Sequence, residues 1–141
     1  MKDEFDLDRF VKAQDKIFDT VIKELRAGRK ESDWMWYVFP QLKGLGRSYK
    51  SDYYGIESLE EAYAYLNHLL LGDRLETCFK ILLELKTSNP VSIFGSIDHE
   101  KLHSCATLFM IADPQNPIFQ QIIDKFFQWT DFETENLLKK D

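Results

Sequence analysis

Residues 7–25 read LDRFVKAQDKIFDTVIKEL, and this stretch predicts the fold class most directly. Its apolar side chains recur at steps of three and four residues, a spacing that places them along one face of an α-helix. This face comprises Leu7, Phe10, Val11, Phe18, Val21, Ile22 and Leu25, and it also includes Gln14. Asp6 can cap the start of the helix and Gly28 can end it. Because a buried amide needs hydrogen-bond partners, we expect Gln14 either to hold the structure together or to belong to a site.

The same periodicity continues through most of the remaining chain. It predicts helices over residues 58–71, 73–88, 98–112 and 117–127. A short turn of helix over 90–94 and a short terminal helix over 131–138 complete the set. Several of these predicted helices begin at recognisable capping residues, such as the capping box that begins at Ser58 and the Asn116-Pro117 pair. The connections are short and contain no linker that would separate two domains.

The segment between the first predicted helix and the helix predicted over residues 58–71 is harder to interpret. Residues 34–39, WMWYVF, hereafter the Trp-rich segment, are of types that favour strands. Pro40 would nevertheless end a short helix, and no second convincing strand exists, so we favour a helix here. Residues 40–56, which contain three glycines, are expected to form a loop. The chain is therefore predicted to be all-α, a compact multihelical single domain over residues 1–141 with about six to seven helices.

Composition excludes several classes of protein. The chain has 141 residues, of which 44% are hydrophobic and 30% charged, as in a globular domain. No apolar run approaches the roughly 18 residues that would span a bilayer, and the N-terminus is too acidic for a secretory signal. Cys78 and Cys105 lie on apolar faces of predicted helices, which indicates buried free thiols. We therefore expect a cytoplasmic protein without membrane association.

The charge is distributed unevenly along the chain. The net charge of −6 argues against general nucleic-acid binding, because the phosphate backbone would repel such a protein. Residues 26–50, however, contain six basic and two acidic residues, a local charge of +4, whereas the rest of the chain carries −10. A positive region of this size can attract a small anionic ligand.

This region also contains the main candidate site. Glycines allow a loop to turn its N–H groups towards an anion, and arginine can hold a phosphate or carboxylate with two hydrogen bonds. The candidate set is Gly44, Gly46, Arg47 and Ser48 for the anion, Trp34 and Trp36 for stacking, and Gln14, Lys30 and Gln41 for orientation. The alternative is a tight structural turn with a solvated Arg47 and with Trp34 or Trp36 as a core residue. The spacing matches neither a dinucleotide fingerprint nor a phosphate-binding P-loop.

Residues 99–103 match the His-Glu-x-x-His pattern of zinc enzymes. Two histidines four residues apart share one face of a helix, but we identify no third ligand. We therefore interpret His99 and His103 as surface histidines and expect neither a metal nor a cofactor. No catalytic nucleophile, acid or base can be assigned from spacing.

Several motifs resemble one bacterial family, catalogued as domain of unknown function 1810, whose members sometimes carry the name calpastatin. These motifs are residues 10–14, 24–30, 34–42, 44–48, 54–56, 71–75 and 93–95, with further matches through residue 109. The resemblance covers nearly the whole chain and implies an all-helical fold. Asp33 stands where the family usually has histidine, and His103 where it usually has arginine or lysine. The second departure indicates that the zinc-like pattern is accidental.

Ala13-Gln14, followed by Gly46-Arg47-Ser48, is also similar to the NADAR family. That family comprises helical N-glycosidases that act on sugar-phosphate and ADP-ribose-type substrates. The resemblance implies a site for a phosphorylated or nucleotide-like ligand, with N-glycosidic bond hydrolysis as one form of its activity. Such hydrolysis would need a carboxylate that the sequence does not identify. Whether the protein is an enzyme stays open at this point.

The alternative hypothesis is a non-enzymatic interaction module. In this case the Trp-rich segment would pack against a partner protein or against a second copy in a homo-oligomer, because tryptophan and arginine are favoured at interfaces. A concave pocket around Trp34, Trp36 and Arg47 would favour the ligand hypothesis, and a flat exposed patch would favour the partner hypothesis.

Overall fold

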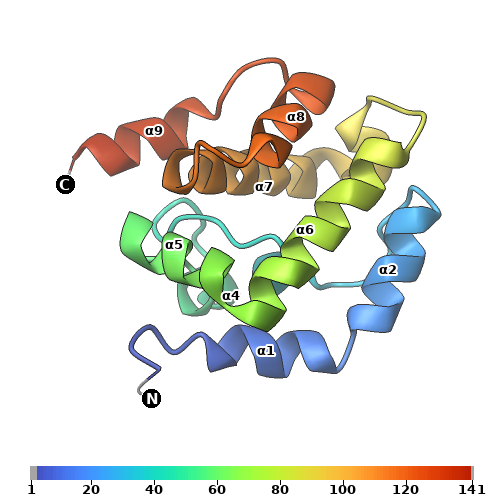
Figure 1. Ribbon diagram of the computed structural model, residues 1–141. Coiled ribbons are helices and arrows are strands. Elements are labelled where there is room, and N and C mark those ends of the chain that lie inside the picture. Colours follow the sequence, from blue (N-terminus) through green and yellow to red (C-terminus); the bar gives the residue numbers. More distant parts are fainter. Residues whose placement is uncertain (1–2, 141) are drawn as a thin grey trace.

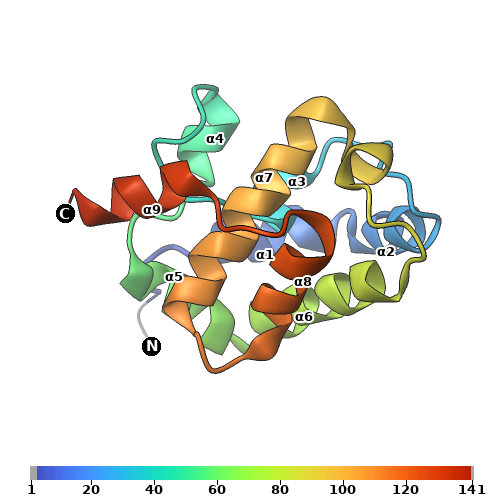
Figure 2. The same ribbon diagram turned by 90° about the horizontal axis from the view of Figure 1, so that it is seen from above.

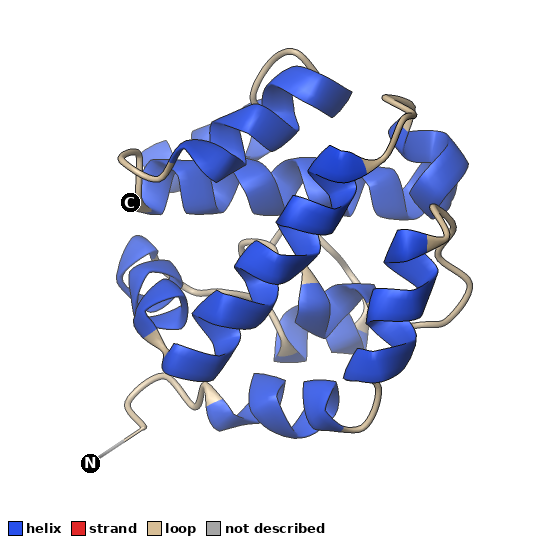
Figure 3. Cartoon of the chain, turned by 45° about the vertical axis from the view of Figure 1, so that its right-hand side comes forward, coloured by secondary structure: helices blue, strands red, loops and turns tan. Residues whose placement is uncertain are grey.

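The computed structural model describes residues 3–140, and this part of the chain folds into nine helices and no strand (Figures 1 and 3). The helices are α1 (Asp8–Asp15), α2 (Phe18–Arg26), α3 (Met35–Val38), α4 (Tyr49–Tyr53), α5 (Leu59–Asn67), α6 (Leu69–Glu84), α7 (Pro90–Ala112), α8 (Pro117–Phe126) and α9 (Phe132–Lys139). The prediction of an all-α fold is confirmed. None of the helices in the described part of the chain is both long enough and apolar enough to cross a bilayer.

The predicted number of six to seven helices is wrong, mainly because two segments differ from the expectation. The first predicted helix is divided at Ile17, which leaves the helical region with φ −137° and ψ −2°. The apolar stripe keeps its phase across this break, so its spacing cannot reveal it. In addition, the predicted loop over residues 40–56 contains α4, which Ser48 caps by accepting a hydrogen bond from the Ser51 N–H.

Two other helix boundaries differ from the predicted ones. The turn over 90–94 and the helix over 98–112 are one element, α7, with a kink at Gly95, whose φ of 86° suits glycine. Helix α6 begins before Gly72 rather than after it, because the His68 ring accepts hydrogen bonds from the N–H groups of Leu70 and Leu71. A Cβ atom on Gly72 would lie 2.1 Å from the Leu66 carbonyl oxygen. Gly72 thus permits close packing of α6 against α5 rather than marking a helix end.

The core lies where α5, α6, α7 and α8 meet. Helix α7 contacts α5, α8 and α9, and Figures 1 and 2 show α8 and α9 on one side of it with α1 at the far side of the molecule. A continuous series of ring contacts runs through this core, with centroid separations of 5.1–6.0 Å, and comprises Phe10, Tyr65, Phe109, Phe119, Phe79 and Phe39. Large aromatic side chains bury much area per residue, so this series contributes strongly to the stability of a short chain.

One carboxylate organises the connection between α2 and α3. The Glu24 carboxylate accepts hydrogen bonds from the Glu31 N–H at 2.9 Å, the Ser32 N–H at 3.0 Å, the Ser32 hydroxyl at 2.6 Å and the Trp34 indole N–H at 2.8 Å. Burial alone would raise the pKa of Glu24, but these hydrogen bonds outweigh it and lower the pKa to about 2. The connection is thereby folded back along α2, and the Trp34 side chain enters the core fully buried.

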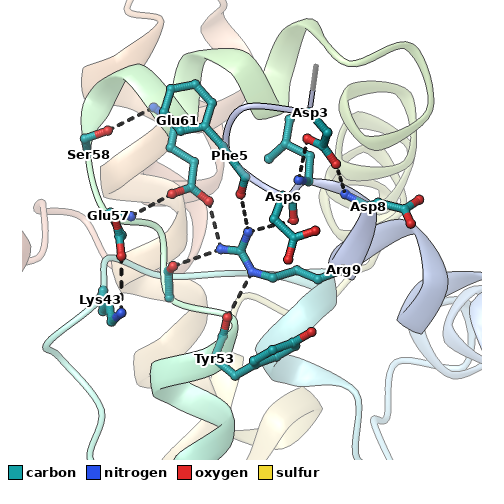
Figure 4. A network of polar contacts seen from close by, with 12 residues as sticks. Asp3, Phe5, Asp6, Asp8, Arg9, Lys43, Tyr53, Glu57, Ser58 and Glu61 are labelled. Atoms are coloured by element: carbon teal, nitrogen blue, oxygen red, sulfur yellow. Dashed lines mark hydrogen bonds and ion pairs between the residues drawn. The ribbon is translucent and has the colours of Figure 1, made fainter. Parts of the chain in front are cut away.

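A second polar network joins the N-terminal segment to α5 (Figure 4). The Arg9 guanidinium donates to the backbone carbonyls of Phe5, Asp6, Tyr53 and Gly55 and to the Glu61 carboxylate at 2.8 Å. Both charged side chains are buried, with exposed fractions of 8% and 3%. A buried ion pair is retained only when further hydrogen bonds satisfy its atoms, and Arg9 meets this condition with backbone oxygens.

We expect Glu24→Gln to lower the free energy of unfolding at pH 7 by about 2 kcal/mol or more, because an amide oxygen replaces a charged acceptor of four hydrogen bonds. The pKa of Glu24 in the folded protein lies below the ordinary value of 4.5, so the stabilisation is complete above about pH 4.5 and is lost as the pH falls towards 2. Urea denaturation of the unmodified protein and of Glu24→Gln gives the free-energy difference between them, which should be smaller at pH 3 than at pH 7. Glu31→Gln, at an exposed neighbouring carboxylate, is the matched control, and equal effects of the two substitutions would contradict the assignment.

Arg9→Ala should lower the free energy of unfolding by about 3 kcal/mol, because it leaves Glu61 buried without its charged partner. Chemical denaturation followed by circular dichroism gives the value. Arg29→Ala is the control, since Arg29 is exposed and its side chain has no hydrogen bond or ion pair with residues 3–140. A loss below about 0.5 kcal/mol in Arg9→Ala, the usual range for surface changes, would show that the network does not hold the N-terminal segment.

Candidate functional site

The nine residues predicted to form a site do not converge on one place. Gln14 is 1% exposed, and its amide group donates to the Tyr37 carbonyl at 2.6 Å and to the Tyr65 hydroxyl at 3.0 Å. Its oxygen accepts a hydrogen bond from Arg74 at 3.3 Å. Both amide hydrogens are therefore used within the protein, and Gln14 joins α1, α3, α5 and α6 rather than facing a ligand.

Lys30 and Trp34 are structural as well. The Lys30 ammonium group lies 2.8 Å from an Asp98 carboxylate oxygen and 5.1 Å from the centroid of the Trp34 ring. The side chain of Lys30 is only 7% exposed, and Trp34 is fully buried. The expectation that Trp34 could stack on a ligand is thus wrong, because its ring is enclosed in the core and its N–H is bonded to Glu24.

Two residues of the glycine-containing loop have local structural tasks. A Cβ atom on Gly46 would lie 2.3 Å from the Ser51 hydroxyl oxygen, so glycine is required for the loop to pack against α4. The Ser48 hydroxyl accepts from the Ser51 N–H at 3.1 Å and donates to the Ser51 hydroxyl at 3.0 Å. These contacts fit the alternative of a tight structural turn.

Gly44 and Arg47 lie on the side of this loop that faces α9. Gly44 adopts a φ of 102°, which favours glycine, and both residues line a depression of about 340 Å³ together with Glu133, Asn136 and Lys140. Arg47 itself is exposed. Arg47 therefore lines this depression and does not line the larger groove described next.

That groove is the best candidate for a functional site. It has a volume of about 640 Å³ and lies between α7, the connection from α8 to α9, and the loop over residues 41–46. Helix α7 supplies His99, Glu100, Lys101 and His103 to its wall, and α9 supplies Glu133. Of the nine predicted residues, only Gln41 and Gly46 line it.

Large apolar side chains surround the groove. Val91, Ile97, Trp129 and Phe132 line it with exposed fractions of 44%, 71%, 69% and 70%. Sequence reasoning missed Trp129, because it lies outside every periodic stripe in a short connection. One feature of the sequence could have indicated it: Trp129 is a large aromatic residue that lies two positions before Asp131, the residue that caps α9.

His103 fixes the position of the Trp129 backbone. One ring nitrogen of His103 lies 2.6 Å from the Trp129 carbonyl oxygen, and the imidazole stacks on Phe127 with centroids 4.1 Å apart. Gln128, between the two aromatic residues, has a φ of 78°. The chain thus turns sharply here, and the turn presents the Trp129 ring at the groove.

The groove is lined by both acidic and basic side chains. Glu100 and Glu133 contribute carboxylates, whereas the carboxylate of Asp131 is occupied by the Ser104 hydroxyl and by the N–H and hydroxyl of Thr134. Lys101 supplies the positive charge, and its ammonium group lies 4.7 Å from the centroid of the partly exposed Trp36 ring. The Lys50 ammonium group lies at the same distance from that ring.

The His-Glu-x-x-His pattern lies in this groove. Each histidine has a ring nitrogen near a backbone carbonyl oxygen, His99 at 3.1 Å from Gly95 and His103 at 2.6 Å from Trp129. Among residues 3–140, no group of three or more histidine, cysteine or acidic side chains is arranged to hold a metal ion. The pattern therefore supplies polar groups to the groove wall.

Comparison with known proteins identifies a family without an assigned activity. The model of the family described as "Protein of unknown function (DUF1810)" matches residues 4–138. The conserved hypothetical protein Rv1873 from Mycobacterium tuberculosis is 47% identical in sequence to this chain, and its crystal structure matches the present structure with a TM-score of 0.95. The match covers 97% of this chain and 99% of that one. A comparison with curated proteins gave no match. The chain therefore belongs to the DUF1810 family of proteins of unknown function.

Proposed function

We propose that this protein binds a small phosphorylated or nucleotide-like ligand in the groove beside α7. The observation that carries the proposal is that an exposed tryptophan, Trp129, and a basic residue, Lys101, line the same concave site. A volume of about 640 Å³ lies within the usual range for small-molecule sites, roughly 300–1,000 Å³. A flat group of the ligand would stack on Trp129, while its negatively charged group would approach Lys101.

The surroundings of Trp129 support a stacking role. Its ring is largely exposed, but its carbonyl oxygen is bonded to His103, so the backbone that presents the ring is held in place. Because the backbone is already held, only the side-chain torsions of Trp129 have to be ordered when a ligand binds, which favours affinity. Stacking of a base on an aromatic side chain contributes about 1–3 kcal/mol in nucleic-acid-binding proteins.

The same groove offers carboxylates for a hydrolytic reaction. N-glycosidic hydrolysis needs a carboxylate to stabilise positive charge on the sugar and to activate water. Glu100 on α7 and Glu133 on α9 both line the groove, and we propose them as candidates for this role. Binding does not depend on hydrolysis, so a protein that binds the ligand without cleaving it would leave the binding proposal intact. The cytoplasmic location that we propose fits the buried free thiols of Cys78 and Cys105.

A second candidate function is protein interaction through the same face. Val91, Ile97, Trp129 and Phe132 are large apolar side chains exposed together around the groove, and such groups often mark interfaces. Trp34 of the Trp-rich segment is fully buried, so we propose Trp129 as the anchor in this alternative. The concave shape of the site favours the small ligand over a flat interface.

Thermal unfolding of the protein with a panel of nucleotides, ADP-ribose, NAD and sugar phosphates tests the ligand proposal. A ligand at a hundred times its Kd adds about 2.7 kcal/mol of stability, which corresponds to a rise in Tm of roughly 5–10 °C for a domain of this size. We expect Trp129→Ala to abolish this rise while leaving the Tm of the free protein nearly unchanged. Tyr49→Ala, at an exposed aromatic residue on α4 outside the groove, should retain it. No shift with any compound, or an equal shift in Trp129→Ala, would contradict the proposal.

Light scattering over a range of protein concentrations separates the two candidate functions. For a small-molecule site we expect the mass of one chain at all concentrations. A mass that doubles with concentration, and returns to that of one chain in Trp129→Ala, would establish the groove as an interface and replace the ligand proposal.

A further inference from the structure

The Trp36 indole N–H is a buried donor without an acceptor. Within residues 3–140, its Nε1 is the one buried side-chain nitrogen or oxygen that has no hydrogen-bond partner. Buried polar groups in folded proteins are nearly always satisfied, so this N–H is available to an acceptor from outside the chain, either a water molecule or a ligand atom. By contrast, the indole N–H of Trp34, two residues earlier, is bonded to Glu24.

The same indole is surrounded by excess positive charge. Lys50 on α4 and Lys101 on α7 each place an ammonium group 4.7 Å from the centroid of the Trp36 ring. Asp98 pairs with Lys101 at 3.5 Å, but it also pairs with Lys30 at 2.8 Å. Lys50 has no ion pair within the described part of the chain. Lys30 and Lys101 therefore share one carboxylate and Lys50 has none, so an anion would neutralise part of the excess positive charge around the indole.

The Trp36 cluster, which we define as Trp36, Lys50 and Lys101, adjoins the proposed ligand groove. Lys101 belongs to both, since it lines the groove and contacts the Trp36 ring. On the other side, Gly46 lines the groove and packs against Ser51, the residue after Lys50. The cluster thus adjoins the groove at Lys101.

We propose that the Trp36 cluster is an oxyanion subsite that holds a phosphate group of the ligand. The indole N–H and the two ammonium groups would donate to its oxygens, with the exposed Lys50 side chain rotating away from the ring to admit it. A phosphate carries up to two negative charges and several acceptor oxygens, which match the excess charge and the unpaired donor. This inference rests on the proposed function of the groove. The sequence predicted that Arg47 and Ser48 would hold the phosphate, whereas this inference assigns it to Trp36, Lys50 and Lys101.

The three tryptophans allow a direct test by NMR, because each gives one indole N–H signal in a ¹⁵N correlation spectrum. Trp36→Phe and Trp129→Phe assign two of the signals, and the third belongs to Trp34. Inorganic phosphate is added at constant ionic strength, which is held with potassium chloride. We expect the Trp36 proton signal to move downfield with saturation, as a new hydrogen bond requires, and the Trp34 signal to stay in place.

Lysine variants establish that the shift reports the subsite. Lys50→Ala removes a charge from an exposed position, so the variant should fold, and it should weaken phosphate binding about tenfold. Lys12→Ala is the matched control, because Lys12 is exposed on α1 and, among residues 3–140, its one ion-pair partner is Asp8. A Trp36 signal that does not respond to phosphate, or responds equally in both variants, would overturn the subsite.

The Trp129 signal separates failure of the subsite from failure of the groove. If a nucleotide moves the Trp129 signal while neither it nor phosphate moves that of Trp36, the groove binds ligand and the subsite is wrong. If phosphate moves the Trp36 signal while no compound of the panel moves that of Trp129, the subsite is correct and the proposed function of the groove is wrong.

Discussion

The four hydrogen bonds to the Glu24 carboxylate determine where the Trp-rich segment lies. They fold residues 31–34 against α2 and carry the Trp34 ring into the core, where it packs near Phe39 and Lys30. Helix α3 begins directly after this anchored residue, so the position of Trp36 beside α4 and α7 follows from it. A carboxylate with four donors is fully satisfied, and this explains why its pKa falls to about 2 despite partial burial.

Much of the fold could be predicted from local sequence. The helix starts at Ser58 and at Asn116 are confirmed, because side-chain caps act on N–H groups two or three residues away. The break at Ile17 and the role of Gly72 could not be predicted. Both depend on packing between elements: α1 contacts α3 as well as α6 whereas α2 contacts α6, and at Gly72 a Cβ atom would collide with a carbonyl oxygen of α5. Periodicity describes one helix at a time and contains no such information.

The candidate site was harder to predict, because residue type does not say which side chains face solvent. Gln14 and Lys30 looked suited to a ligand, but each is bonded inside the protein to a partner that lies far away in the sequence, Tyr65 and Asp98 respectively. Gln41 and Gly46 do line the groove, whereas its other functional groups come from α7 and the α8–α9 connection. Trp129 was missed for the complementary reason: an isolated aromatic residue in a loop has no periodic signal, and its exposure follows from the turn around it.

The central claim is that Glu24 anchors Trp34 in the core, while Trp129 stays free at the groove. Hydrogen exchange of the three indole N–H groups in D₂O, followed by NMR, tests this claim most directly. The Trp34 N–H is bonded to Glu24 in a fully buried side chain, so it should exchange most slowly and only when the core opens. Trp129, which is 69% exposed, should exchange fastest. Exchange of Trp34 as fast as that of Trp129 would contradict the anchor and the arrangement of the groove that depends on it.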